Sequence, residues 1–196
     1  MVKLKNKRKK KQDEIVYAFV DAQNVTYGVS ATHWKLDWGK FRLFLRNKYG
    51  VEKAFLFIGY IESNADLYKR LQEQGFILIF KNVLEIQDGD SVTYKGNVDA
   101  ELVLHAMIEY PNYYKAVVVT GDGDFFCLIE YLEENDKLKK IVTPNIRYSS
   151  LLRKFSSYIV DLHTLRGKLN YTGKKKKRKE SEDKEHKERH SRGKQG

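Results

Sequence analysis

The chain has 196 residues, enough for one domain with a buried core. Its single cysteine, Cys127, excludes an internal disulfide framework and a cysteine-based zinc site, and favours a reducing compartment. No apolar stretch approaches the roughly 20 residues of a membrane-spanning helix, and the first residues lack the apolar block of a signal peptide. We therefore expect a soluble, cytoplasmic protein. Cys127 lies in an apolar run and is expected to be a small core residue.

The formal net charge of +11 is concentrated at the two ends of the chain. Residues 1–14 hold seven basic and two acidic side chains, and residues 166–196 hold thirteen basic and five acidic ones. Residues 15–165 hold seventeen basic and nineteen acidic side chains, a slightly acidic balance. We therefore expect one folded domain between two disordered basic tails. Such tails suit sequence-independent attraction to phosphate backbones, and a solubilising or targeting role is the alternative.

Apolar runs of strand length alternate along the domain with segments of helical spacing. The first run, at 15–20, has no polar alternation, which predicts a strand buried on both faces. The expected strands cover 15–20, 54–58, 76–80, 117–120, 140–143 and 158–162. The expected helices cover 37–46 behind a candidate N-cap at Asp37, 63–75, 98–110, 125–134 and 150–155. The Asp88-Gly89 pair predicts a hairpin within 83–97. This order predicts a mostly parallel sheet with helices on both faces.

Four aspartates stand where predicted strands end or helices begin. Asp21 follows the first strand, Asp122 and Asp124 follow the fourth, and Asp99 begins the helix that leads toward the fourth. Ligands of open α/β sheets bind beyond the carboxyl ends of the strands, so we expect these carboxylates to converge there. Close carboxylates repel one another unless they are protonated or bridged by cations. Mg²⁺ or Mn²⁺, which prefer oxygen ligands, would make the arrangement favourable.

Each of these acids has an alternative interpretation as a helix cap. Asp21 could cap the segment that follows the first strand, and Asp99 and Asp124 stand at predicted helix starts, where a carboxylate also complements the helix dipole. A cap at Asp124 leaves Asp122 without a local role, and the flanking glycines permit a sharp turn. The doublet therefore favours a metal site over a set of caps.

Three further residues are candidates for contacts with a substrate. Asn24 could orient a ligand water or a phosphate oxygen, with a plain turn residue as the alternative. Lys95, at the foot of the predicted hairpin, could contact a substrate backbone. Trp34 lies with Tyr27 in an expected loop after the first strand and could stack on a base, whereas Trp38 fits a helix face better.

Three segments carry a resemblance to a known family: FVDAQN at 19–24, KGNVD at 95–99 and TGDGDF at 120–125. Together they resemble the NYN domain, a family of PIN-like nucleases that includes the LabA-type proteins. The resemblance covers nearly all of 15–165. It implies a Rossmann-like three-layer α/β/α fold and a metal-dependent ribonuclease. The positions that match the acidic site of the family are Asp21, Asn24, Asp99, Asp122 and Asp124.

One position departs from the pattern of the family. Many relatives have a second aspartate six residues after the position of Asp99, and this chain has His105 there. We expect His105 to be a helix residue near the site and not a metal ligand. The departure leaves a non-cleaving RNA-binding module of the same fold as the alternative function.

Phosphodiester cleavage requires an activated water and stabilisation of charge on the attacked and leaving oxygens, which one or two cations can supply. We assign Asp21, Asp99 and Asp122 as direct or water-mediated ligands, with Asp124 completing the site. The expected function is a ribonuclease, more specifically an endonuclease, that acts on RNA with Mg²⁺ or Mn²⁺, with a homodimer left open.

Two other enzyme classes fit less well. A phosphatase of the haloacid dehalogenase type needs a second aspartate two residues after its nucleophile, where this chain has Gln23. A Toprim-type site would want a glutamate after its first strand, where this chain has Asp21.

Overall fold

The computed structural model describes residues 15–82, 84–88, 91–95 and 98–173. The predicted tail at 1–14 and most of the one at 166–196 lie outside the described residues. The strands are β1 (Val16–Asp21), β2 (Val51–Tyr60), β3 (Ile77–Asn82), β4 (Leu84–Asp88), β5 (Ser91–Lys95), β6 (Lys115–Val119), β7 (Leu138–Thr143) and β8 (Ile159–Asp161). The α-helices are α2 (Ala22–Ser30), α3 (Trp38–Tyr49), α4 (Ala65–Glu73), α5 (Asp99–Ile108), α6 (Phe126–Glu134) and α7 (Arg166–Leu169). Short 3-10 helices are η1 (Glu62–Asn64), η2 (Gly123–Phe125), η3 (Ser150–Tyr158) and η4 (Leu162–Leu165).

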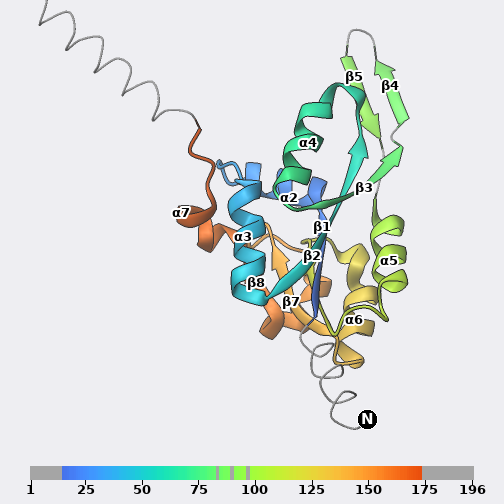
Figure 1. Cartoon of the computed structure of the whole chain (residues 1–196), viewed down its shortest axis with the longest axis vertical. Helices are drawn as coiled ribbons and strands as arrows, with labels where there is room; N and C mark the ends of the chain where they lie inside the picture. The colour runs from blue at the N-terminus through green and yellow to red at the C-terminus, as the bar shows by residue number, and fades with distance from the viewer. Residues whose placement is uncertain (1–14, 83, 89–90, 96–97, 174–196) are drawn as a thin grey trace, which may run out of the picture.

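Six strands form one sheet in the order β3-β2-β1-β6-β7-β8, and every neighbouring pair is parallel. The chain moves outward from β1 to β3 and then returns to add β6, β7 and β8 on the other side. The order therefore reverses between β1 and β6, where doubly wound sheets bind their ligands. The predicted hairpin is confirmed as the antiparallel pair β4 and β5, in which Asp88 pairs with Ser91. It projects beyond the end of β3 (Figure 1).

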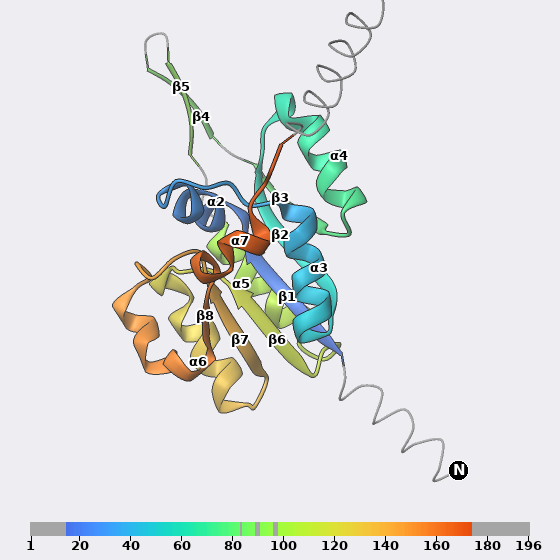
Figure 2. The ribbon, with the colours of Figure 1, turned by 90° about the vertical axis from the view of Figure 1, so that its left-hand side faces the viewer.

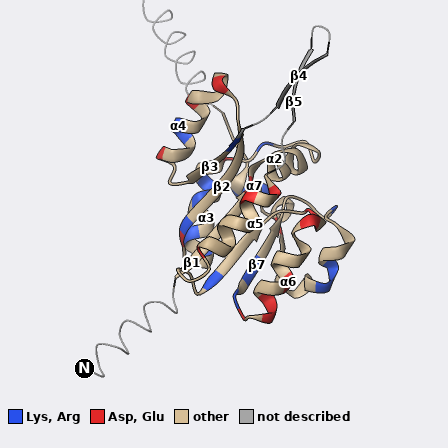
Figure 3. Cartoon of the chain, turned by 90° about the vertical axis from the view of Figure 1, so that its right-hand side faces the viewer, with Lys and Arg blue, Asp and Glu red and all other residues tan. Residues whose placement is uncertain are grey.

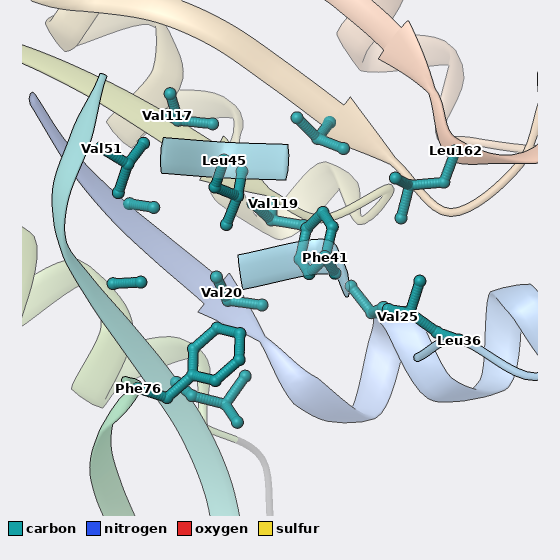
Figure 4. Packing of buried hydrophobic residues seen from close by; sticks show 14 of the residues in the cluster. Val20, Val25, Leu36, Phe41, Leu45, Val51, Phe76, Val117, Val119 and Leu162 are labelled. Carbon is teal, nitrogen blue, oxygen red and sulfur yellow. The ribbon is translucent and has the colours of Figure 1, made fainter. Parts of the chain in front are cut away.

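Helices cover both faces of the sheet, which confirms the predicted three-layer α/β/α fold. One core cluster joins the sheet to α2, α3, α4 and α7, and the other joins it to α5, α6 and η3. Figure 2 shows α3 and α6 on opposite sides of the sheet. Alternate residues of β1 serve the two clusters, with Val20 in the first and Phe19 in the second. Figure 4 shows the first cluster, where Phe41 and Leu45 of α3 lie over Val20 and Val119. A central strand buried on both faces explains the uninterrupted apolar runs in the sequence.

The ends of the helices follow local capping rules. Asp37 accepts a hydrogen bond from the backbone N–H of Lys40 at 3.0 Å, which confirms it as the N-cap of α3. Gly75 follows α4 with a φ of +91°, in the left-handed region that favours glycine. Within the described residues, no helix is both long and apolar enough to cross a membrane.

Two local predictions are wrong. Residues 22–30, expected as a loop, form α2 directly after β1, because Asp21 caps the helix and Val25 and Val29 pack into the core. Cys127, expected in the core, is exposed. The buried face of α6 is formed by Leu128 and its helical neighbours, and Cys127 lies outside that face.

The C-terminal boundary of the domain also needs correction, because residues 166–171 belong to the fold. Leu169 is only 3% exposed and lies in the first core cluster. Asn170 forms a β-bridge with Leu36 and accepts a hydrogen bond from Lys40 Nζ at 2.9 Å. The N–H of Tyr171 donates to the carbonyl of Lys35 at 2.8 Å. One buried leucine and three backbone contacts dock this segment in spite of its basic composition.

Replacing Leu169 with alanine tests this boundary. We expect Leu169→Ala to lower the free energy of unfolding by about 2–4 kcal/mol, because it leaves a cavity against α3. Urea denaturation followed by circular dichroism measures the change. Tyr171→Ala is the matched control, because Tyr171 is 51% exposed, and its effect should stay within about 0.5 kcal/mol. Equal effects of the two variants would contradict the corrected boundary.

Candidate functional site

A pocket of about 280 Å³ opens at the carboxyl ends of the strands, between the start of α2 and the start of α5. Its place agrees with the reversal of strand order between β1 and β6. The lining residues are Asp21, Gln23, Asn24, Tyr27, Val98, Asp99 and Asp122. Three of the four predicted aspartates therefore line a single pocket.

Asp21 is a buried carboxylate beside this pocket. It is the last residue of β1 and is 5% exposed. Its Oδ1 accepts a hydrogen bond from the backbone N–H of Asn24 at 3.0 Å, so the helix-cap interpretation is also confirmed. The pKa of Asp21 is raised to about 6, mainly by burial; the Asn24 N–H lowers it, and the nearby charges of Asp99 and Asp122 raise it. A negative charge at this position is therefore costly without a compensating cation.

Asp99, Asp122 and Asp124 form the tightest acidic group. Each offers an oxygen, and these oxygens all lie within 4.8 Å of one another. Two oxygens on opposite sides of Mg²⁺, bonded at about 2.0–2.1 Å, lie about 4 Å apart, so small side-chain rotations would bring this donor set around one ion. Asp99 also stands in the first turn of α5, where its charge complements the helix dipole. The carboxylates fit a hard divalent cation.

The turn after β6 reverses the predicted roles of its two acids. Asp122, not Asp124, is the capping residue, because its Oδ1 accepts from the backbone N–H of Asp124 at 3.1 Å. The start of α6 has no side-chain cap of its own. Asp122 thus has a local role that the sequence did not reveal. The support for a cation site now comes from the proximity of the carboxylates.

The second glycine of this turn, Gly123, is required by close packing and not by a left-handed backbone. A Cβ atom on Gly123 would lie 2.4 Å from Ser149 Oγ and 3.0 Å from a methyl carbon of Leu151. The N–H of Ser149 donates to the carbonyl of Gly121 at 2.9 Å. The segment after β7 therefore lies directly against the acidic turn.

Asn24 connects the two halves of the site. Its Oδ1 accepts a hydrogen bond from the backbone N–H of Gly121 at 2.8 Å, across 97 positions of sequence. The side chain thus holds the end of β1 against the turn that carries Asp122. With Oδ1 engaged in this way, the amide nitrogen of Asn24 is the group that could donate to a phosphate oxygen.

The other candidate residues lie apart from the pocket lining. Trp34 is 6% exposed, packs in the first core cluster and donates its indole N–H to Thr32 Oγ1 at 3.0 Å. The prediction that Trp34 stacks on a base is therefore wrong, since its ring is buried. The ring of His105 contacts Phe55 at 5.2 Å and Phe57 at 5.8 Å between centroids, so the side chain packs on the sheet. It is absent from the pocket lining and from the acidic group.

Lys95 ends β5, paired with Leu84, and its side chain lies outside the described part of the structure.

The sequence did not predict that Gln23 and Tyr27 lie together in the pocket. They stand one helical turn apart on α2, and both line the pocket. Their shared face becomes visible only once the helix is known to begin immediately after Asp21.

A parallel doubly wound sheet with clustered aspartates at its switch point defines a Rossmann-like domain with a candidate cation site. The model of the NYN domain matches residues 16–165, and the chain belongs to this family. Members of the family are generally nucleases.

Two individual proteins are also similar to the chain. The low amplitude and bright protein LabA of Synechococcus elongatus is 24% identical over 161 residues, which cover 79% of this chain and 87% of LabA. A crystal structure of a protein of unknown function from Vibrio parahaemolyticus has a TM-score of 0.64 and 24% identity, and covers 77% of this chain and 94% of that one. This structural similarity supports the fold.

The raised pKa of Asp21 predicts a pH-dependent stability in chelator. The folded protein binds the proton more tightly than the unfolded chain, so wild type loses stability as the pH rises from about 4 through 6. Asp21→Asn keeps a good N-cap and removes the charge. We expect this variant to be more stable than wild type by up to about 3 kcal/mol at pH 8 and equal to it near pH 4.

Urea denaturation in chelator at pH 4, 6 and 8 measures the difference. Asp66→Asn, an exposed carboxylate on α4, is the matched control and should show the same pH dependence as wild type. A pH-independent difference between Asp21→Asn and wild type would contradict the prediction.

Proposed function

We propose that the chain is a cation-dependent ribonuclease that cleaves RNA internally with Mg²⁺ or Mn²⁺. The observation that carries this proposal is the group of three carboxylates, Asp99, Asp122 and Asp124, within 4.8 Å of one another beside the buried Asp21. The general nuclease character of the NYN family supports it.

Asp99, Asp122 and Asp124 would hold the cation, with Asp21 as a direct or water-mediated ligand. When bound, one or two such ions supply an activated water and neutralise charge on the phosphate oxygens. The charge of Asp21 is costly in the cation-free pocket, and a bound cation would offset that cost.

Neutral and basic groups would position the RNA. The amide nitrogen of Asn24 would donate to a phosphate oxygen, while its Oδ1 keeps the acidic turn in place through Gly121. Lys95 would contact the RNA backbone from the foot of the hairpin. The basic segments at 1–14 and 174–196 would add salt-dependent attraction to phosphates around a slightly acidic domain at 15–165. In Figure 3 acidic and basic residues are interspersed over the described ribbon of this domain.

A non-cleaving RNA-binding module would have the same fold. The departure that favoured it, His105, packs against the sheet and does not line the pocket. Cleavage is therefore the function that the geometry supports best.

Cation binding can be tested by thermal unfolding. At a cation concentration about 100 times the dissociation constant, we expect stabilisation by about 2.7 kcal/mol. For a chain of this size, that corresponds to a rise of about 5–10 °C in Tm. Asp122→Asn should abolish the rise and leave the fold intact, because asparagine can still accept the N–H of Asp124. Asp66→Asn should keep the full rise, and an equal rise in Asp122→Asn would exclude this residue as a ligand.

Cleavage can be tested with a circular RNA, which an exonuclease cannot attack. We expect wild type to linearise it with Mg²⁺ or Mn²⁺ and to lose this activity in chelator. Asp99→Asn and Asp122→Asn should each lower the rate at least about a hundredfold, because each removes a charge from the cation site. Gel electrophoresis of the products measures the rates. Identical residual activity in wild type and Asp122→Asn would show that cleavage does not come from this site.

A further inference from the structure

An exposed aromatic ring stands at the mouth of the acidic pocket. Tyr27 of α2 lines the pocket and is 67% exposed. Within the described residues its ring makes no aromatic contact and its hydroxyl makes no hydrogen bond. The side chain therefore offers a free π-face next to the carboxylates, which the buried Trp34 does not.

The segment that follows β7 forms a second exposed rim beside the acidic turn, outside the residues that line the pocket. Ile146 is 76% exposed and Arg147 is exposed. Their neighbours lie against Gly121, where a Cβ atom would be 3.3 Å from both Pro144 Cδ and Tyr148 Cβ. Arg147 is thus a cationic residue beside the turn that carries Asp122.

A buried asparagine joins the two rims. Asn145 is 6% exposed, its Nδ2 donates to the carbonyl of Gly28 at 2.6 Å, and its Oδ1 accepts from the N–H of Arg147 at 2.7 Å. Gly28 directly follows Tyr27, and a Cβ atom on it would lie 2.4 Å from Pro144 Cγ. The backbones that carry Tyr27 and Arg147 are therefore fixed relative to each other by one polar side chain and a close contact.

An acidic pocket on a slightly acidic domain repels the phosphates that it would have to bind. Attraction at the rim would therefore add to that of the cation and the basic segments, and base stacking and a guanidinium can both supply it. Because a base can stack on a protein ring only when it is unpaired, this type of rim selects single strands.

We propose that Tyr27 and Arg147 form a clamp for single-stranded RNA beside the acidic pocket. One base stacks on Tyr27, the guanidinium of Arg147 binds a backbone phosphate beside the acidic turn, and Asn145 is the positioning residue that fixes the two rims relative to each other. This inference rests on the proposed ribonuclease function, and it names the substrate class and the residues that select it.

Binding of the full-length chain to a fluorescent single-stranded RNA, measured by anisotropy in chelator, tests the clamp without cleavage. Tyr27→Ala should weaken binding about tenfold, and Tyr27→Phe should stay within about twofold of wild type. Arg147→Ala should lower the slope of log Kd against log salt by about 0.7, whereas Arg147→Lys should preserve the slope. Duplex RNA of the same sequence should be insensitive to Tyr27→Ala.

The matched controls are Tyr114→Ala, at an exposed tyrosine just before β6, and Arg46→Ala, at an exposed arginine in the last turn of α3. Both residues lie at the amino ends of the strands, opposite the pocket. Both variants should therefore bind RNA as tightly as wild type does. A series of RNAs that each lack one base adds an internal control. At one position of the RNA, removal of the base should leave wild type and Tyr27→Ala with the same affinity. The base that stacks on Tyr27 is then already missing.

Wild-type affinity in both Tyr27→Ala and Arg147→Ala, or equal losses in the two control variants, would overturn the clamp. If the clamp effects appear but no RNA is cleaved with any divalent cation, the proposed ribonuclease function alone fails. If RNA is cleaved but both rim variants bind normally, the clamp alone fails.

Discussion

The site depends on one hydrogen bond, from the backbone N–H of Gly121 to Oδ1 of Asn24 at 2.8 Å. It joins the end of β1 to the turn after β6, the two neighbouring strands at which the order of the sheet reverses. Asn24 also donates its own N–H to Asp21, so one residue sets the position of the buried carboxylate and of the acidic turn. A neutral amide can make this connection without adding a further charge to the pocket.

This hydrogen bond brings together carboxylates that destabilise the fold when no counter-charge is present. Burial and the charges of Asp99 and Asp122 raise the pKa of Asp21, which means that the cation-free fold resists its ionised form. Natural proteins tolerate such costs where activity needs them. The two large core clusters on either side of the sheet supply the stability that allows it.

The central strands were predictable because a strand buried on both faces must be apolar at every position. The helix at 22–30 was not, since its threonine, glycine and valines have low helix propensity and it forms through the Asp21 cap and core packing. The segment around Leu169 was assigned to a tail because its basic composition outweighed one apolar residue. Trp34 was the predicted stacking residue, with Tyr27 in the same expected loop, but Trp34 is buried and Tyr27 is exposed.

The sequence by itself determined the layered fold and the presence of acids at strand ends, because both follow from local patterns of apolar and polar residues. The tertiary structure alone decided that β1 lies beside β6, and therefore which acids meet and that Asn145 links Tyr27 to Arg147. Several strand orders would satisfy the same apolar pattern equally well. Distances between residues as far apart as 24 and 121 are set by how the strands and helices pack, which no local pattern encodes.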